Sequence, residues 1–398
     1  MKRRNATNAA RRFIATTDLD GFTVGIVGGG IGGLTAALAF ADRGASVSVL
    51  EQAKEFTEVG AGIQITPNAA RVFQALGLLE FLPRIGIEAE AVVPVDGLTG
   101  KAITGFDLSA QSPRYHFVHR AKLLEMLVNA CIGRGVQLHT NSRVASATDE
   151  GVMSFEDVDA THAQFDLVVF ADGIHSIGRA LINGPTEPFF AGQVAWRAIV
   201  SGSMTNAAQV IMGPGRHIVL YPLGPNQINL VAVQERSNWA KEGWNHADDP
   251  ANLQDAFSDF APDIRALLEK VETVNLWGLF RHEVAQSWVK GRMTMLGDAA
   301  HPTLPFLAQG ANLAIEDAYV LARSVERDGR VQGLGTYQNM RRPRVIRAID
   351  AANANAKNYH LSGPQRWASH MALRGLGVVA PNAFLRRLSW LYDFDVTV

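Results

Sequence analysis

Residues Phe22 to Gln52 read FTVGIVGGGIGGLTAALAFADRGASVSVLEQ, and this stretch decides the fold. Its apolar pattern predicts a short buried strand over 22–27, an Ala/Leu-rich helix from residue 31 to about 43, and a second strand over 46–50. A strand–helix–strand unit of about thirty residues belongs to a parallel sheet. We therefore expect an α/β fold.

The loop between the first strand and the helix, GGGIGG at residues 28–33, fits the pattern GxGxxG. Gly28 allows a tight turn, Gly30 lets a diphosphate approach the backbone, and Gly33 lets helix and strand pack closely. Glu51 ends the second strand, where a carboxylate accepts hydrogen bonds from ribose hydroxyls. The unit thus predicts a dinucleotide site, and Glu51 disfavours a 2′-phosphate because two anions repel.

Two later segments also carry an acidic residue at the end of an expected strand. Asp172 follows the apolar run 167–170, where capping an ordinary turn is its alternative role. Asp298 opens the segment GDAAHPTLPFLAQGANLAIEDA (297–318), which crosses a proline-containing loop and enters a helix at about Gly310. The free N–H groups of a helix start suit an anionic or carbonyl-rich group. Together the segments predict an extended dinucleotide held from both ends.

Composition narrows the remaining classes. A chain of 398 residues with 47% hydrophobic content can bury one large or two moderate cores, and a net charge of −1 argues against a nucleic-acid partner. Cys131 is the only cysteine, so no intramolecular disulfide can form, and the histidines show no metal spacing. No apolar run approaches the roughly 20 residues of a membrane span. We expect a cytoplasmic protein whose residues 1–20 form a disordered tail.

Taken together, the motifs resemble the single-component FAD-dependent aromatic hydroxylases, the class A flavoprotein monooxygenases. The further segments that resemble their salicylate hydroxylase and 3-hydroxybenzoate 6-hydroxylase branch are GAGIQITPNA (60–69), HRAKLLEML (119–127), QVAWRA (193–198) and RRPR (341–344). The resemblance implies bound FAD, NAD(P)H as a transient electron donor with NADH favoured, and O2 and a small aromatic compound as substrates. The implied activity is hydroxylation of a phenolic acid such as salicylate or a hydroxybenzoate through a flavin C4a-hydroperoxide.

The architecture that this resemblance implies is α/β, with two domains and a tail of helices. A Rossmann-like FAD-binding domain would take residues 21–85, 105–185 and 280–325. A mixed β-sheet substrate domain would be inserted as residues 86–104 and 186–279. The C-terminal helical segment would be 326–398, and its amphipathic character leads us to expect a homodimer.

The resemblance also assigns roles to single residues. The expected cofactor-binding residues are Gly28, Gly30, Gly33, Glu51, Gln52, Gly62, Arg120, Asp172, Asp298, Gly310, Ala311 and Asn312. His217 is expected to deprotonate or bind the phenol, because an unperturbed pKa of about 6.5 suits a base at neutral pH. Tyr221 would line the pocket on the same strand face, and the Pro305 carbonyl would lie near the flavin and the substrate ring. A hydrogen-bonded sheet histidine and plain core packing are the alternatives for His217 and Tyr221.

Several points stay open in the sequence. Ala308 stands where the family commonly has the first glycine of PxxGxG, and its methyl group would narrow the space beside the flavin. Any of three arginines, Arg197, Arg216 and Arg281, could hold a substrate carboxylate, and His301 is expected to be structural. The alternative activities are an FAD monooxygenase or epoxidase for a larger secondary metabolite or an N-heteroaromatic acid and, outside the oxygenases, a nicotinamide dehydrogenase or a redox-sensing protein.

Overall fold

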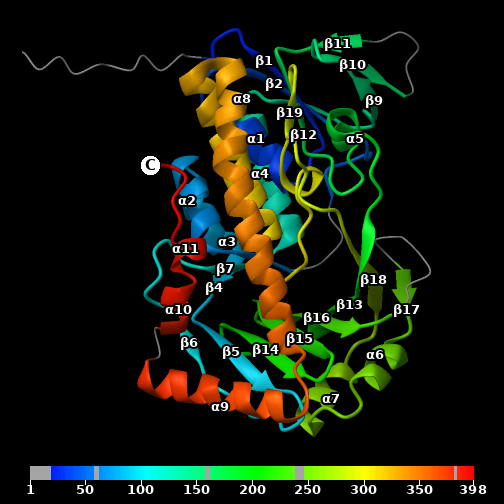
Figure 1. The fold of residues 1–398 in the computed structure, drawn as a ribbon, viewed down its shortest axis with the longest axis vertical. Coiled ribbons are helices and arrows are strands. Elements are labelled where there is room, and N and C mark those ends of the chain that lie inside the picture. The colour runs from blue at the N-terminus through cyan, green and yellow to red at the C-terminus, as the bar shows by residue number, and fades with distance from the viewer. Residues whose placement is uncertain (1–18, 58–61, 157–161, 238–245, 381–382) are drawn as a thin grey trace, which may run out of the picture.

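The computed structural model describes residues 19–57, 62–156, 162–237, 246–380 and 383–398. One end of the molecule holds a parallel sheet with its helices, the other end holds a larger mixed sheet, and a long helical element runs between them (Figure 1). The tail expected over residues 1–20 falls outside the described residues up to residue 18. The α/β class with a C-terminal helical segment is confirmed.

The first sheet has six strands in the order β19-β20-β12-β1-β2-β8. Its strands from β20 to β8 are parallel, as the strand–helix–strand pattern predicted, and β19 is antiparallel to β20. Its elements are β1 (Thr23–Val27), α1 (Ile31–Ala41), β2 (Ser46–Leu50), β8 (Gln137–His139), β12 (Leu167–Phe170), β19 (Val289–Lys290) and β20 (Met293–Met295).

Burial explains why α1 carries no charge until its end. The helix packs on β1 and β2 on one side and on α4 (Arg120–Gly133) and α8 (Gly310–Tyr359) on the others. Residues Leu34 and Phe40 are fully buried, and so are the alanines between them. A helix covered on nearly all sides must be apolar around its whole circumference, which is what the Ala/Leu pattern encodes.

The element α8 is two helices joined at Gly329, whose backbone is non-helical with φ 72° and ψ 166°. The second half folds back along the first, since Arg341 reaches Asp317 and a Cβ at Gly333 would lie 2.4 Å from the carbonyl oxygen of Ser324. The returning half then continues to the second sheet, where Ala352 and Ala356 join its core. One helical hairpin thus touches both ends of the molecule.

The second sheet has eight strands in the order β17-β18-β13-β16-β15-β14-β5-β6, with β14 and β5 parallel and the other pairs antiparallel. The strands are β5 (Ala91–Asp96), β6 (Phe106–Asp107), β13 (Phe189–Ser201), β14 (Ala207–Gly213), β15 (Arg216–Gly224), β16 (Gln227–Glu235), β17 (His246–Asp248) and β18 (Val274–Arg281). Strand β6 lies beyond residue 104, the expected edge of the substrate domain, yet it pairs with β5. The domain boundaries themselves stay a proposal.

The two faces of this sheet have different neighbours because side chains alternate along a strand. One face, with Trp196, Ile218 and Leu230, packs on α6 (Pro250–Ala256) and α7 (Pro262–Leu268). The opposite face, with Ala195 and Val233, packs on the loop before α8 and on the end of α8. We call this second face the inner face.

Smaller elements complete the fold. They are the sheet β3 (Gly62–Ile65), β7 (His116–His119) and β4 (Gly86–Glu88), the sheet β9 (Val144–Ala147), β10 (Val152–Phe155) and β11 (His162–Gln164), and the helices α2 (Pro67–Ala75), η1 (Leu79–Phe81), α3 (Leu82–Ile85), α5 (Ile177–Asn183), η2 (Gly297–Ala299), α9 (Gly363–Val379), α10 (Ala383–Arg387) and α11 (Ser389–Tyr392). Among the described residues, no helix combines the length and apolarity that crossing a membrane requires.

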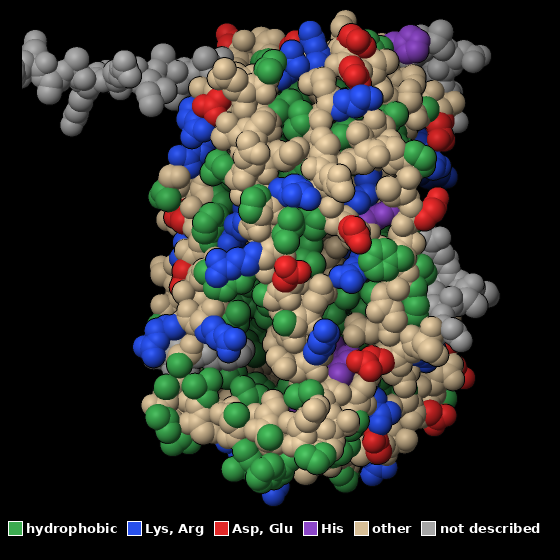
Figure 2. Space-filling view, in the orientation of Figure 1, with side chains coloured by type: hydrophobic (Ala, Val, Ile, Leu, Met, Phe, Trp, Pro, Cys, Tyr) green, Lys and Arg blue, Asp and Glu red, His purple; other side chains and the backbone are tan. Residues whose placement is uncertain are grey.

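Helix α9 crosses the end of the molecule below the second sheet (Figure 1). Its exposed apolar residues include Trp367, Met371, Val378 and Val379. Figure 2 shows apolar side chains gathered at this end of the molecule.

A cluster of buried charges lies where α8 begins. Glu316 and Asp317 are both fully buried. Arg341 contacts both carboxylates, at 2.6 Å and 2.7 Å, and Arg344 donates two hydrogen bonds of 2.7 Å to Glu316. His301 Nε2 lies 2.5 Å from Asp317. Each buried carboxylate therefore has more than one partner, which offsets the cost of removing it from water.

Replacing Arg341 should be far more damaging than replacing an exposed arginine of the same helical hairpin. Arg341→Met leaves two buried carboxylates short of a cation, and we expect a loss of about 3 kcal/mol in the free energy of unfolding. Arg327→Met removes only a surface pair with Asp328 and should cost less than about 1 kcal/mol. Urea denaturation of the two variants tests this, and equal losses would show that the cluster does not stabilise the fold.

Candidate active site

The glycine loop has the geometry that its sequence pattern predicts. Gly28 has φ 103°, and a Cβ there would lie 2.5 Å from the carbonyl oxygen of Ala171. A Cβ at Gly33 would lie 2.0 Å from the carbonyl oxygen of Gly28, so neither position tolerates a side chain. Nothing lies within 4 Å of a Cβ built on Gly30. Open space at the N-terminus of α1 is what an approaching diphosphate requires.

The acidic residues lie at the carboxyl ends of adjacent parallel strands. Glu51 follows β2, Asp172 follows β12, and Asp298 follows β20, while Gly28 follows β1 between them. Glu51 accepts hydrogen bonds from the N–H of Gly29 at 2.7 Å and of Ala53 at 2.8 Å. A carboxylate has further lone pairs for ribose hydroxyls. The exposed Gln52 stands beside it.

Asp172 and Asp298 have features expected of groups that contact a ligand. Asp172 Oδ1 is buried without a hydrogen-bond partner among the described residues, while Oδ2 accepts from the N–H of Ile177 at 2.9 Å. Burial raises the pKa of Asp172 to about 6. Asp298 is exposed, yet desolvation raises its pKa, against the opposing effects of His301 and Arg120. Both carboxylates are thus desolvated by the protein that surrounds the strand ends.

The start of α8 supplies further backbone N–H groups. The first hydrogen bond of the helix runs from the N–H of Leu313 to the carbonyl of Gln309 at 2.8 Å. The N–H groups of Gly310, Ala311 and Asn312 therefore have no acceptor within the helix. The Asn312 side chain is already engaged, because it accepts from the N–H of Thr66 and donates to the carbonyl of Gln64. Only its backbone N–H is left for a ligand.

These observations fit the FAD that the resemblance implies. The open glycine loop, the orphaned carboxylate oxygen of Asp172 and the helix start suit a diphosphate, hydroxyl groups and a carbonyl-rich ring. Arg120 begins α4 and acts electrostatically on Asp298. Gly62 fits less directly, since its N–H is donated to Asn229 Oδ1 at 2.7 Å. The cofactor roles of all these residues stay predictions.

The loop before α8 has a strained backbone. Leu307 and Ala308 have φ values of 61° and 55°, which glycine adopts far more readily than other residues. The conformation explains why glycine is usual at position 308, where the sequence suggested only a narrowed space. Gln309 and Tyr392 donate hydrogen bonds to the carbonyl of Leu307, and Asn312 donates one to that of Ala308. The surrounding contacts hold the loop in place.

His217 lies on the inner face of the second sheet and meets this loop. Its side chain is 1% exposed, and its ring centroid lies 5.5 Å from that of Phe306, the residue after Pro305. The structure thus brings His217 and the Pro305 loop together. Burial, with a smaller effect of His360, lowers the pKa of His217 well below its usual value. The unperturbed pKa expected from the sequence does not apply, and the ring is neutral at pH 7.

Tyr221 lies on the same strand face as His217, four residues further along β15, and its side chain is also buried. Its ring stacks on Phe117 at 5.1 Å between centroids, and a Cβ at Gly62 would lie 2.6 Å from it. Burial raises the pKa of the Tyr221 hydroxyl, which is therefore neutral. Tyr221 connects the inner face with β3 and β7.

The three candidate arginines fall in different surroundings. Arg197 pairs in register with Val231, and Val231 with Val219, so Arg197 shares the inner face with His217. Its guanidinium lies 4.8 Å from the centroid of the Trp277 ring. Arg216 lies on the opposite face, where it pairs with Asp259 at 2.7 Å. Arg281 ends β18 and covers the ring of the exposed Phe189.

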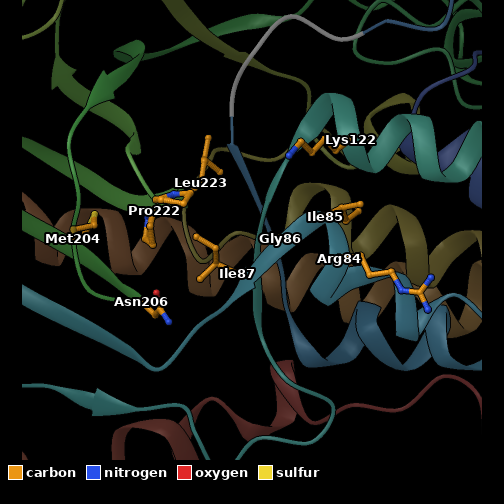
Figure 3. Close-up of a pocket in the computed structure, with 11 residues that line it drawn as sticks. Arg84, Ile85, Gly86, Ile87, Lys122, Met204, Asn206, Pro222 and Leu223 are labelled. Atoms are coloured by element: carbon orange, nitrogen blue, oxygen red, sulfur yellow. The ribbon is translucent and has the colours of Figure 1, made fainter.

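One cavity lies away from these residues. It has a volume of 460 Å³ between α4, which carries Lys122, and the end of β15, which carries Pro222 and Leu223 (Figure 3). Its remaining lining comes from β4 and its neighbours and from the turns beside β14 and β15, and includes Arg84, Ile85, Gly86, Ile87, Met204 and Asn206. None of the site residues expected from the sequence lines it. The candidate site is therefore defined by the residues at the strand ends, the start of α8, the Pro305 loop and the inner face, and not by this cavity.

Two residues that the sequence did not single out, His360 and Glu235, are connected to His217 by hydrogen bonds. His217 Nδ1 lies 2.7 Å from Nε2 of His360, and His360 Nδ1 lies 2.7 Å from Oε1 of Glu235. His360 follows the last residue of α8, and Glu235 ends β16. These contacts join residues 143 and 125 positions apart, so no local pattern reveals them.

Glycine at position 308 should relieve the strained loop. We expect Ala308→Gly to raise the free energy of unfolding by about 1 kcal/mol, because the left-handed conformation opposes a Cβ. Ala372→Gly, at an exposed position inside α9, is the control and should lower it by about 0.5–1 kcal/mol. Urea denaturation measures both. A destabilised Ala308→Gly would mean that the loop does not adopt the left-handed conformation.

The raised pKa of Asp172 predicts a pH-dependent stability in the protein stripped of cofactor. In the unfolded chain the pKa of the carboxyl is near 3.8, and in the folded protein it is about 6. The contribution of the Asp172 carboxyl to the free energy of unfolding is therefore fully present below pH 4 and is lost as the pH rises through 6. We expect Asp172→Asn to gain up to about 2 kcal/mol at pH 7–8 and nothing at pH 4. A gain that is the same at both pH values would contradict a desolvated carboxylate.

Comparison with known proteins places the chain in a family. Residues 21–352 match the FAD binding domain family. The chain is 33% identical to the 3-hydroxybenzoate 6-hydroxylase of Polaromonas naphthalenivorans (strain CJ2), covering 93% of this chain and 96% of that protein. It is 33% identical to the 3-amino-4-hydroxybenzoate 2-monooxygenase of Streptomyces cremeus, covering 86% and 89%.

A solved structure supports the same assignment. Klebsiella pneumoniae HpxO complexed with FAD and uric acid superposes with a TM-score of 0.81 at 26% identity, covering 93% of this chain and 97% of that one. The resemblance stated from the motifs is confirmed. The chain belongs to the FAD binding domain family and is an FAD-dependent monooxygenase.

Proposed function

We propose that this monooxygenase hydroxylates a small phenolic acid such as salicylate or a hydroxybenzoate, with NADH as the favoured electron donor and O2 as the oxidant. The observation that carries the proposal is the inner face, where Arg197, His217 and Tyr221 share one surface opposite the Pro305 loop. A cation, a neutral base and a phenol therefore lie on one face of the sheet. Relatives named for hydroxybenzoates support this substrate class.

The residues at the strand ends would hold the cofactor. Gly28, Gly30 and Gly33 would receive the diphosphate at the start of α1, Glu51 with Gln52 the ribose, and Asp172, Asp298 and Arg120 the central part of the molecule. Gly62 and the N–H groups of Gly310, Ala311 and Asn312 would face the ring. The flavin, when bound, supplies the activation of O2. The protein supplies position and charge.

The inner face would prepare the phenol. A hydroxybenzoate carboxylate would pair with Arg197, whose planar guanidinium suits bidentate recognition. The phenolic O–H would then donate a hydrogen bond to His217, and loss of its proton would make the ring richer in electrons. Leu304, Phe306, Ala195 and Val233 form an apolar cluster around this point and keep water away. Tyr221 would line the pocket toward β3, and Pro305 would face the ring.

The assembly and the location belong to the proposal as well. The exposed apolar residues Trp367, Met371 and Val378 of α9 support the expected homodimer, because a surface of this kind is usually covered by a partner. A cytoplasmic enzyme is consistent with a single, buried cysteine.

A substrate panel tests the function. The FAD-loaded enzyme is given NADH or NADPH with salicylate, 3- and 4-hydroxybenzoate, 3-hydroxypyridine acids and larger bicyclic phenols, and NADH and O2 consumption are followed with product analysis. We expect coupled consumption and one hydroxylated product with a hydroxybenzoate. Hydroxylation of the larger phenols alone would favour a secondary-metabolite substrate, and oxidation of NADH to peroxide with every compound would reject the phenolic-acid reading.

A matched pair of arginine variants tests the substrate anchor. Arg197→Gln should raise the KM for the acid about thirtyfold, because a charged hydrogen bond contributes about 2 kcal/mol. Arg216→Gln removes an arginine from the same sheet, two strands away on β15, but from the opposite face, and should leave this KM unchanged. Equal changes of the KM in the two variants would show that position on the inner face does not determine which arginine binds the substrate carboxylate.

A further inference from the structure

We propose that His217, His360 and Glu235 form a relay that carries the phenolic proton of the substrate from the inner face to the surface. The proposal rests on the phenol chemistry proposed above. It adds a route for the proton, because a base enclosed in apolar side chains cannot release a proton directly to water.

The three residues form a continuous path with an exit. Both links are 2.7 Å long, from His217 Nδ1 to His360 Nε2 and from His360 Nδ1 to Glu235 Oε1. The side chains of His217 and His360 are buried, while that of Glu235 is 54% exposed. The path therefore begins under the Pro305 loop and ends in solvent.

The backbone fixes the path. The N–H of Gly215 donates to the carbonyl of His360 at 3.1 Å, and the N–H of Glu235 donates to the carbonyl of Gly215 at 2.9 Å. The end of α8 is thus tied to the strands that carry the other two members. A chain of hydrogen bonds needs this rigidity to keep both links short.

The charge of Glu235 sets the tautomer of each ring. An ionised carboxylate only accepts, so His360 Nδ1 carries the hydrogen and its Nε2 is an acceptor. His217 must then donate from Nδ1, which leaves the lone pair on its Nε2. The surface carboxylate in this way prepares the buried base to accept a proton.

The proton balance follows from these tautomers. The phenolic O–H bond breaks and the proton joins His217 Nε2, while the Nδ1 proton of His217 passes to His360 Nε2. The Nδ1 proton of His360 passes to Glu235 and from there to water. The substrate stays in the site as a phenolate. A proton that returns from water through Glu235, His360 and His217 to the product oxygen restores both tautomers.

Other titratable groups around the path do not compete with it. The Tyr359 ring lies 5.2 Å from that of His217, its hydroxyl accepts from Asn355, and burial raises its pKa to about 12. Arg216 pairs with Asp259, and Arg236 lies over the Trp196 ring. Burial also lowers the pKa of His360, although Glu235 opposes this. Neither imidazole retains the proton.

The test measures proton release when substrate binds to the FAD-loaded enzyme. Stopped-flow mixing with a hydroxybenzoate follows phenolate absorbance, and a pH indicator follows the proton in weak buffer. We expect Glu235→Gln to slow proton release at least about tenfold, a part of the 10²–10⁴ that a positioned acid or base contributes. The matched control is Glu272→Gln, another exposed glutamate of the same domain, which should behave as the wild type.

Two further variants separate a relay from a structural role. Glu235→Asp keeps a carboxylate and should restore release, and His360→Asn should slow it as Glu235→Gln does. FAD content and the melting temperature of Glu235→Gln should equal those of the wild type. A merely structural His360 would change these two properties in His360→Asn but would leave the pH profile of phenolate formation in Glu235→Gln unmoved.

The outcomes distinguish the two proposals. If the wild type forms phenolate and hydroxylates the substrate while both Glu235→Gln and His360→Asn release protons at the wild-type rate, the relay is overturned and the hydroxylase stands. If the wild type binds no phenol of the panel and hydroxylates none, the proposed function itself fails.

Discussion

The cofactor side of the structure depends on two buried carboxylates, Glu316 and Asp317, at the start of α8. Neither can be buried as a charge without cations, and Arg341 and Arg344 of the returning helix supply them. The same carboxylates accept from the N–H of Gly297 and from the side chain of Asn68. A single electrostatic requirement therefore fixes the helical hairpin, the turn that presents Asp298, and the start of α2. Because a buried ion pair tolerates little displacement, the segments that these contacts join are held rigidly.

The same helical hairpin also contacts the second sheet and fixes the position of the inner face. Its first half begins with Gly310 and Ala311, whose N–H groups have no acceptor within the helix, and its second half leads to His360 against the inner face. The strained residues Leu307 and Ala308 lie between the two, held by side chains from α8 and from the C-terminal segment. The expected cofactor site and the inner face are therefore positioned by one element, although their residues are scattered along the chain.

Some of this could be predicted from the sequence, because the signals are local. The glycine loop and Glu51 lie within one strand–helix–strand unit, and Asp172 and Asp298 follow strands whose parallel pairing brings their ends together. Arg216 could also have been separated from His217, since neighbouring residues of a strand face opposite sides. The roles of Arg341 and His360 could not be predicted, because each acts through a contact with a distant segment. The neutral state of His217 depends on burial, which only the folded chain defines.

The inner face contains a physical conflict that explains its polar connections. In the proposed reaction, apolar side chains such as Phe306 and Leu304 would keep water from the substrate ring, and a dry site would strengthen the attraction of Arg197 for a carboxylate. The same dryness makes His217 a poor place for a positive charge, as its lowered pKa shows. A base that must not keep a proton needs a neighbour that takes it. The hydrogen bond to His360 meets this need without opening the site, since it crosses the protein to Glu235 and water. Different residues of the inner face therefore serve the two needs. The apolar cluster would exclude water, and the path through His360 would release the proton.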